Sequence, residues 1–155
     1  MKKIEIVPYS PELAPHFERI NLRWLNAHFK IEPIDQNLLS DPQKYIIDQG
    51  GEVYFALVDG EVAGTCALEK HPDGSFELIK MGVDPQFQGL GIGKRLGLHT
   101  LERAKALGAD RIWLASSRKL DVVLNLYRKL GFKEFKTDYT QTGYERCDLT
   151  MELNL

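Results

Sequence analysis

The stretch VDPQFQGLGIGKRL, residues 83 to 96, decides how the rest of the chain is interpreted. It places Gly89, Gly91 and Gly93 close together and then passes into a pattern typical of a helix. A turn alone needs one glycine or two, whereas a glycine-rich turn between a strand and a helix presents backbone N–H groups to an anion. Lys94 adds a cation in the first helical turn, where it opposes the helix dipole unless an anion lies nearby. The stretch predicts an anion site, and a flexible turn with a solvated lysine is the alternative.

Two common phosphate-binding motifs do not fit this stretch. A P-loop requires G-x-x-x-x-G-K-[ST], but Arg95 follows Lys94, and Gln88 stands where the first glycine belongs. A dinucleotide fingerprint would need a third glycine at the position of Lys94, and it would need parallel strands rather than an antiparallel meander. A third pattern, [QR]-x-x-G-x-[GA], is satisfied by Gln88, Gly91 and Gly93.

The sequence around this stretch predicts alternating strands and helices. Two D-G turns, at Asp59 and Asp73, separate runs of strand-forming residues and predict a three-stranded antiparallel meander. Ser10 is the expected N-cap of the first helix, with Pro11 in its first turn. The predicted strands cover residues 2–7, 52–58, 61–69, 75–83, 110–116, 132–136 and 144–153, and the longer helices cover 11–29, 92–107 and 119–130.

Composition indicates one ordinary globular domain, because the 155 residues are 43% hydrophobic and 27% charged. A net charge of -2 gives no support for a nucleic-acid partner. Cys66 and Cys147 form no C-x-x-C motif, so we expect reduced thiols and a cytoplasmic protein. No apolar run has the length of a signal peptide or a membrane span, so no membrane association is expected. The four histidines have no metal-binding spacing, so no metal is expected.

Residues 83 to 96 resemble the acyl-coenzyme-A loop of the GNAT superfamily of N-acetyltransferases. LYRKLGF, residues 126 to 132, resembles the second hallmark of that family, and the predicted order of strands and helices matches it. The resemblance is specific from about Tyr54 to Phe132. It implies one mixed α/β (α+β) GNAT domain over residues 1–155, with a mostly antiparallel sheet of about seven strands flanked by about four helices.

The resemblance also implies a reaction. Acetyl-CoA would be the cosubstrate, and its acetyl group would pass to the amine of a small molecule or a protein by direct attack in a ternary complex. A homodimer is left open. Many relatives carry an asparagine where this chain has Leu120, which puts side-chain contacts to pantetheine in doubt. The rival hypothesis is therefore a non-catalytic acyl-CoA-binding or regulatory module.

Cofactor contacts follow from the same resemblance. The pantetheine arm would lie beside the strand that ends at Val83 and bond to the main chain of Met81 and Val83. The thioester would lie in a gap between this strand and the strand at 110–116. The pyrophosphate would sit on backbone amides supplied by Gln88, Gly89, Gly91, Gly93 and Lys94.

The leaving thiolate needs a proton, and the attacking amine must be neutral. The resemblance implies that the hydroxyl of Tyr127 lies near the sulfur and acts as the acid, while a packed core tyrosine is the alternative. Some relatives place a base glutamate at the position of Glu77. Strand alternation puts Glu77 on one face with the following residues, where an apolar surround would raise its pKa and suit a general base. That face would comprise Glu77, Ile79, Met81 and Val83.

Other assignments for these residues stay open at the level of sequence. Glu77 could instead face solvent at a strand end, or be held by Lys80 or Arg111. The acceptor is not defined by any motif. Aromatic residues could line its pocket and aspartates could attract a cationic amine, or the same residues could be core, caps and turns. They are Trp24, Phe29, Tyr45, Tyr54, Asp35, Asp41 and Asp48.

Overall fold

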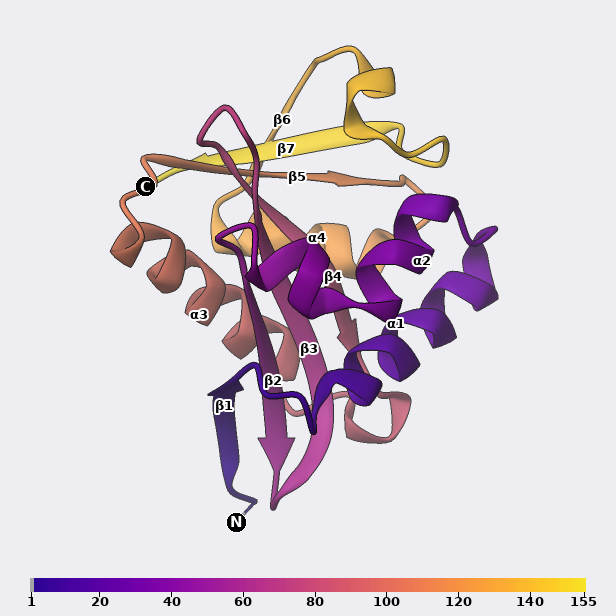
Figure 1. Cartoon of the computed structure of the whole chain (residues 1–155), viewed down its shortest axis with the longest axis vertical. Coiled ribbons are helices and arrows are strands. Elements are labelled where there is room, and N and C mark those ends of the chain that lie inside the picture. Colours follow the sequence, from indigo (N-terminus) through magenta and orange to yellow (C-terminus); the bar gives the residue numbers. More distant parts are fainter. Residues whose placement is uncertain (1) are drawn as a thin grey trace.

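A computed structural model describes residues 2–155 as a sheet with helices on both faces (Figure 1). The predicted meander is confirmed, and so are the helix after the glycine stretch and the strand and helix that follow it. The strands are β1 (Ile4–Pro8), β2 (Glu52–Val58), β3 (Glu61–Lys70), β4 (Phe76–Val83), β5 (Arg111–Ser116), β6 (Lys133–Phe135) and β7 (Leu149–Asn154). The helices are α1 (Ala14–His28), α2 (Pro33–Ser40), α3 (Ile92–Ala106) and α4 (Asp121–Leu130), with shorter turns η1 (Gln43–Ile47), η2 (Pro85–Phe87) and η3 (Tyr139–Thr142).

The seven strands form one sheet in the order β1-β2-β3-β4-β5-β7-β6. Neighbouring strands are antiparallel except for β4 and β5, which are parallel. The expected fold class, a mostly antiparallel mixed sheet of about seven strands with about four helices, is therefore confirmed. In Figure 1, β5 and β7 run across the top while β2 to β4 run vertically, so the sheet is strongly twisted.

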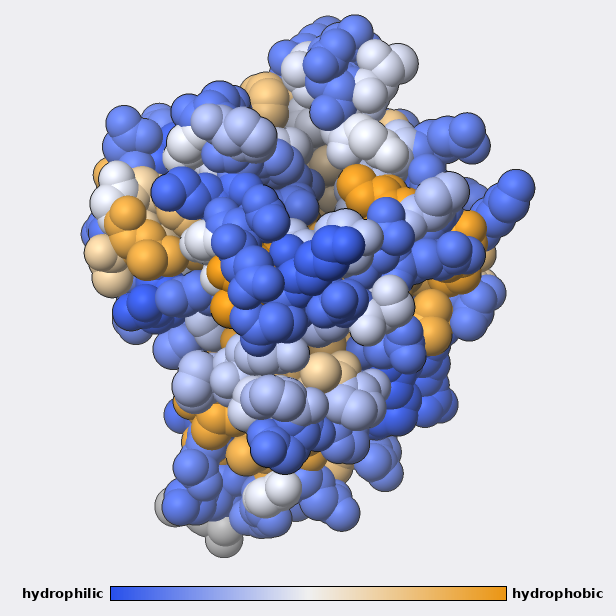
Figure 2. Space-filling view, viewed as in Figure 1, coloured by the Kyte–Doolittle hydropathy of each residue, from blue (hydrophilic) through white to orange (hydrophobic). Residues whose placement is uncertain are grey.

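Two hydrophobic cores lie on opposite faces of the sheet. One contains Phe17 and Leu25 of α1 and Leu38 of α2. The other contains Leu96 of α3 and Tyr127 of α4. In Figure 1 the α1–α2 layer covers the near face and α4 lies behind the strands. That near face is mainly hydrophilic on its outside, with apolar residues only in small separate patches (Figure 2). Within the described residues, no helix has the length and hydrophobicity needed to cross a membrane.

The first helix begins later than the sequence predicted. Its N-cap is Leu13, and Ser10 instead closes a turn by accepting a hydrogen bond from the Leu13 amide at 3.0 Å. A helix with Ser10 as N-cap and Pro11 at its first position would need the N–H of Pro15 for its second bond, to the Pro11 carbonyl, and proline has none. The second proline therefore decides where α1 starts.

The last strand also differs from the prediction, since β7 begins at Leu149 rather than at residue 144. The amide of Glu145 donates to the Glu32 carboxylate at 2.8 Å, and Arg146 donates to Asp35. Contacts with the start of α2 hold this segment in a loop.

A bulge in β4 overturns the predicted alternation. Lys80 has a φ of 53°, and the register against β3 shifts beside it. Ile79 consequently packs in the α1–α2 core, whereas Met81 and Val83 pack in the α3–α4 core. Glu77 and Ile79 share one face, and Met81 and Val83 lie on the other.

Candidate active site

β4 and β5 separate almost as soon as they meet. They pair only at Phe76 with Ile112 and at Glu77 with Trp113, while β5 remains paired with β7 along its whole length. The remainder of β4 thus has a free edge. The amide of Asp84 donates to β3, so alternation turns the main-chain groups of Met81 and Val83 towards this free edge. The predicted gap between the two strands is present, with unpaired main chain along one side.

Unused backbone donors surround the start of α3. Within residues 2–155, the N–H groups of residues 89 to 94 have no hydrogen-bond acceptor, and the first helical bond runs from Arg95 to Gly91. Gln88 differs from the expectation, because its amide already donates to Pro85 at 3.3 Å. A run of free amides at a helix N-terminus is a ready site for an anion, and exposed Lys94 adds a positive charge there.

The three glycines do different things. Gly89 and Gly91 have φ values of 85° and 76°, and a Cβ added at either would meet no atom within 4 Å. Glycine is therefore favoured at both positions because the backbone is left-handed, and the space beside each of them is open. Gly93 lies inside α3, and a Cβ there would come within 3.0 Å of Leu126 of α4. Its missing side chain makes room for helix packing rather than for a ligand.

Glu77 is the last residue of β4 that pairs with β5, and its side chain is only 3% exposed. It lies on the α1–α2 face, opposite Glu69 of β3. Its carboxylate lies 2.7 Å from Nε2 of His71, which in turn lies 3.6 Å from Glu69. Neither Lys80 nor Arg111 holds it, because Lys80 bonds to Asp35 and Arg111 to Glu152.

Burial raises the pKa of Glu77 to about 7, with a further rise from Glu69, although the hydrogen bond with His71 opposes the shift. The same hydrogen bond raises the pKa of His71 against the effect of burial. A carboxyl group with a pKa near neutrality can both accept and release a proton during turnover, which is what a general base requires.

The spacing of the histidines did not predict the cluster of Glu69, His71 and Glu77, but the hairpin between β3 and β4 could have revealed it. A turn centred on Asp73 pairs residue 69 with residue 77 and leaves His71 beside both. The 2.7 Å separation between His71 and Glu77 is a hydrogen-bond distance, so a hydrogen bond holds the imidazole against the Glu77 carboxylate.

Tyr127 lies on the α3–α4 face of the sheet, opposite the face that carries Glu77. It is buried in the α3–α4 core, with its ring 5.9 Å from that of Phe132. Burial raises the pKa of its hydroxyl, which therefore keeps its proton at neutral pH. Within the described chain this hydroxyl has no hydrogen-bond partner.

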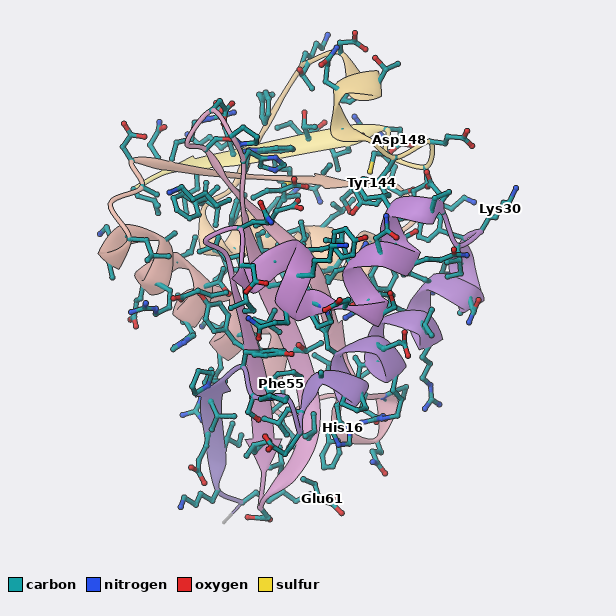
Figure 3. The ribbon with its side chains drawn as sticks, in the orientation of Figure 1. His16, Lys30, Phe55, Glu61, Tyr144 and Asp148 are labelled. Carbon is teal, nitrogen blue, oxygen red and sulfur yellow. The ribbon has the colours of Figure 1, made fainter. Side chains whose placement is uncertain are left out.

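A buried ionic network on the α1–α2 face was missed by the sequence analysis. Asp35 is fully buried and accepts hydrogen bonds from Lys80 at 2.5 Å and from both Nη atoms of Arg146 at 2.7 and 2.8 Å. Tyr144 contacts Lys80 at 3.2 Å and lies between β5 and α2 (Figure 3). Burial opposes ionisation, but Arg146 and Lys80 outweigh it and lower the pKa of Asp35 to about 2. Asp35 is therefore occupied by internal partners and is not free to attract a cationic amine.

Two cavities flank the C-terminal part of α1. The first, of about 210 Å³, includes Trp24, Val83 and Gln88, and the second, of about 480 Å³, includes Phe29, Lys119 and Arg146. His28, at the end of α1, lines both cavities.

The remaining residues expected on the acceptor side have other roles. Tyr54 lies in the α3–α4 core and bonds to Glu52. Asp41 accepts a hydrogen bond from the amide of Lys44, and Asp48 accepts one from Gln43. These two aspartates serve as turn and cap residues.

Comparisons with known proteins agree with this geometry. The family model described as the acetyltransferase (GNAT) family matches residues 17–132. The uncharacterized N-acetyltransferase YvbK of Bacillus subtilis (strain 168) is 38% identical over 105 residues, which cover 66% of this chain and 68% of YvbK.

Two solved structures share the fold over nearly their whole length. A GNAT-family acetyltransferase from Staphylococcus aureus Mu50 has a TM-score of 0.87 at 23% identity, covering 98% of this chain and 99% of that one. The PaiA N-acetyltransferase of Thermoplasma acidophilum, in complex with coenzyme A, has a TM-score of 0.76 at 22% identity, covering 99% of both. The chain belongs to the acetyltransferase (GNAT) family and is an acetyltransferase.

Proposed function

We propose that this protein transfers the acetyl group of acetyl-CoA to an amine by direct attack within a ternary complex. The observation that carries the proposal is the set of free amides at residues 89 to 94, at the mouth of the gap between β4 and β5. The pyrophosphate would bind these amides together with Lys94. The pantetheine arm would run along the free edge of β4 and bond to the main chain of Met81 and Val83.

Glu77 and Tyr127 would act from opposite sides of the gap. Glu77 lies on the α1–α2 face and takes the proton of the acceptor ammonium, either directly or through a water molecule. Tyr127 belongs to the α3–α4 side and donates its proton to the departing thiolate. The acceptor would enter through the cavity lined by Phe29, Lys119 and Arg146, which lies on the same side as Glu77.

Leu120 does not argue against cofactor binding in this arrangement. It forms the N-cap position of α4 and makes no side-chain capping bond there. The contacts proposed for the cofactor come from backbone groups, which a leucine at this position leaves intact.

The experiment that tests the proposal is a measurement of thiol release from acetyl-CoA across a library of small amines, amino acids and peptide amines. Turnover with one class of amine supports the proposal and names the acceptor. Tight binding of acetyl-CoA without turnover on any of these amines would instead favour the non-catalytic module.

Replacing Gly91 by valine should weaken coenzyme A binding at least about tenfold, because a branched side chain strains left-handed backbone and enters the anion site. Gly108→Val is the matched control, because Gly108 has a φ of 88° with equally open surroundings but follows the far end of α3. Isothermal titration calorimetry with coenzyme A should show a loss for Gly91→Val only. Lys94→Ala should weaken binding by less than about fivefold, as expected for one exposed charge. Parental affinity in Gly91→Val would show that the loop is not the pyrophosphate site.

Replacing Tyr127 by phenylalanine should lower kcat by about 10²-fold with little change in acetyl-CoA affinity, because the hydroxyl acts on charge that develops as the thiolate leaves. The ring contact with Phe132 is retained, so the fold should persist. Tyr54→Phe, which removes another buried hydroxyl, should leave kcat unchanged. If Tyr127→Phe keeps the parental kcat under conditions in which chemistry limits the rate, Tyr127 is a packed core residue and not the general acid.

A further inference from the structure

The general base proposed above has a neighbour that leads to solvent. The side chain of Glu77 is 3% exposed, whereas that of His71 is 29% exposed. Their atoms Oε1 and Nε2 lie 2.7 Å apart, and the imidazole is held over the ring of Trp113 with the centroids 5.2 Å apart. Trp113 is in turn fixed by its hydrogen bond to Ser75. The imidazole is therefore positioned between a buried carboxyl group and water.

We propose that His71 carries the proton that Glu77 takes from the acceptor out to solvent, so that Glu77 regains its carboxylate in each turnover. This inference rests on the proposed function and goes beyond the assignment of the base. An N–H bond of the ammonium breaks as an O–H bond forms on Glu77. That O–H bond then breaks as an N–H bond forms at Nε2 of neutral His71 in the tautomer that carries its proton on Nδ1, which yields an imidazolium whose Nε2–H donates to the regenerated carboxylate. The imidazolium releases a proton to water, and the neutral ring returns to its starting tautomer by exchange with solvent.

The charges around the pair determine the direction of its pH dependence. The groups that face the pair are Glu69, Asp73, Lys80, Tyr144 and Cys147. Glu69 and Asp73 favour the imidazolium, whereas Glu69 disfavours the Glu77 carboxylate. Lys80 and His71 favour that carboxylate, so removing His71 should raise the pKa of Glu77 further and move the acidic limb of activity to higher pH.

The test uses variants that separate hydrogen bonding from proton transfer. Glutamine at position 71 can still donate a hydrogen bond to Glu77 but cannot carry a proton. With the amine found in the screen, His71→Gln should lose about tenfold to 10²-fold in kcat/KM and should show the shifted acidic limb. His99→Gln, which alters a histidine packed against Tyr54, should retain parental values.

Chemical rescue distinguishes a proton carrier from a structural residue. Added imidazole should restore part of the turnover of His71→Ala and should have no effect on the parent protein. A His71→Gln protein with parental kcat/KM and pH profile would overturn the proposal, as would failure of imidazole to rescue His71→Ala. Activity that is lost with EDTA and restored by a divalent cation would also overturn it, because the cluster would then be a metal site.

A second measurement needs no acceptor and therefore separates this inference from the proposed function. The ¹⁵N shifts of the His71 ring, followed by NMR across a pH titration of the free protein, should show two coupled steps. In Glu77→Gln the titration should collapse to a single step. An unchanged His71 titration in Glu77→Gln would show that the pair shares no proton, whether or not an acceptor has been found.

Discussion

Asp35→Ala is expected to lower the free energy of unfolding by about 3–5 kcal/mol, because it leaves a buried cation without its partner. Asp35 is fully buried and accepts hydrogen bonds from Lys80 and Arg146 and from the amide of Glu32. Arg146 retains its ion pair with Glu32 at 3.1 Å in the variant, but the 3%-exposed Lys80 side chain loses the only carboxylate with which it forms an ion pair among residues 2–155. Urea denaturation of the parent and the variant at neutral pH measures the difference.

Matched variants make this test specific. Asp48→Ala removes an exposed aspartate that bonds to Gln43 and should cost less than about 1 kcal/mol. The double variant Asp35→Ala, Lys80→Met should recover part of the loss, because it removes the unpaired charge as well. If Asp35→Ala is as stable as Asp48→Ala, the network does not stabilise the fold.

The pH dependence of stability gives an independent check on Asp35. Its pKa is lowered from 3.8 to about 2, so the unfolded state binds the proton first as the pH falls. The contribution of Asp35 should be present above its ordinary pKa and should disappear as the pH falls towards 2. Acid unfolding of Asp35→Ala should lack this component.

Glu77→Gln is expected to lower kcat by about 10²–10⁴-fold, because the amide cannot accept the proton of the acceptor ammonium. The pKa of Glu77 is raised to about 7, so the parent activity should rise as the pH increases through that value. The variant should lack this acidic limb and retain its affinity for acetyl-CoA. Glu152→Gln, at a carboxylate bonded to Arg111, should keep both the rate and the limb.

Stability separates this role from a structural one. The folded pKa of Glu77 lies above the ordinary value of 4.5, so Glu77 makes the fold less stable as the pH rises from about 4.5 to 7. The neutral glutamine removes that effect, and Glu77→Gln should be at least as stable as the parent above pH 7. A variant that fails to fold would show that the carboxylate is structural, and one with an unchanged pH profile would leave deprotonation to another group.

Local sequence rules determined much of this protein. The two D-G turns set the β2–β3–β4 meander, because the positive φ of Asp59 and Gly60 in the first turn and of Gly74 in the second suits a hairpin. The glycines at 89 and 91 marked the loop before α3, since only glycine adopts left-handed backbone there without strain. Such signals act within a few residues, so they can be read without knowing what packs against them.

Only the tertiary structure decided the chemistry of the cluster around Glu77. The bulge at Lys80 moved Met81 and Val83 to the face opposite Glu77, and strict alternation along the strand could not reveal it. Asp35 pairs with Lys80 and Arg146 across 45 and 111 residues, so its partners depend on how α2 packs on the sheet. Burial and long-range partners determine these pKa values, and both arise only when distant segments come together. The sequence therefore revealed the glycine loop before α3 but not the environment of Glu77.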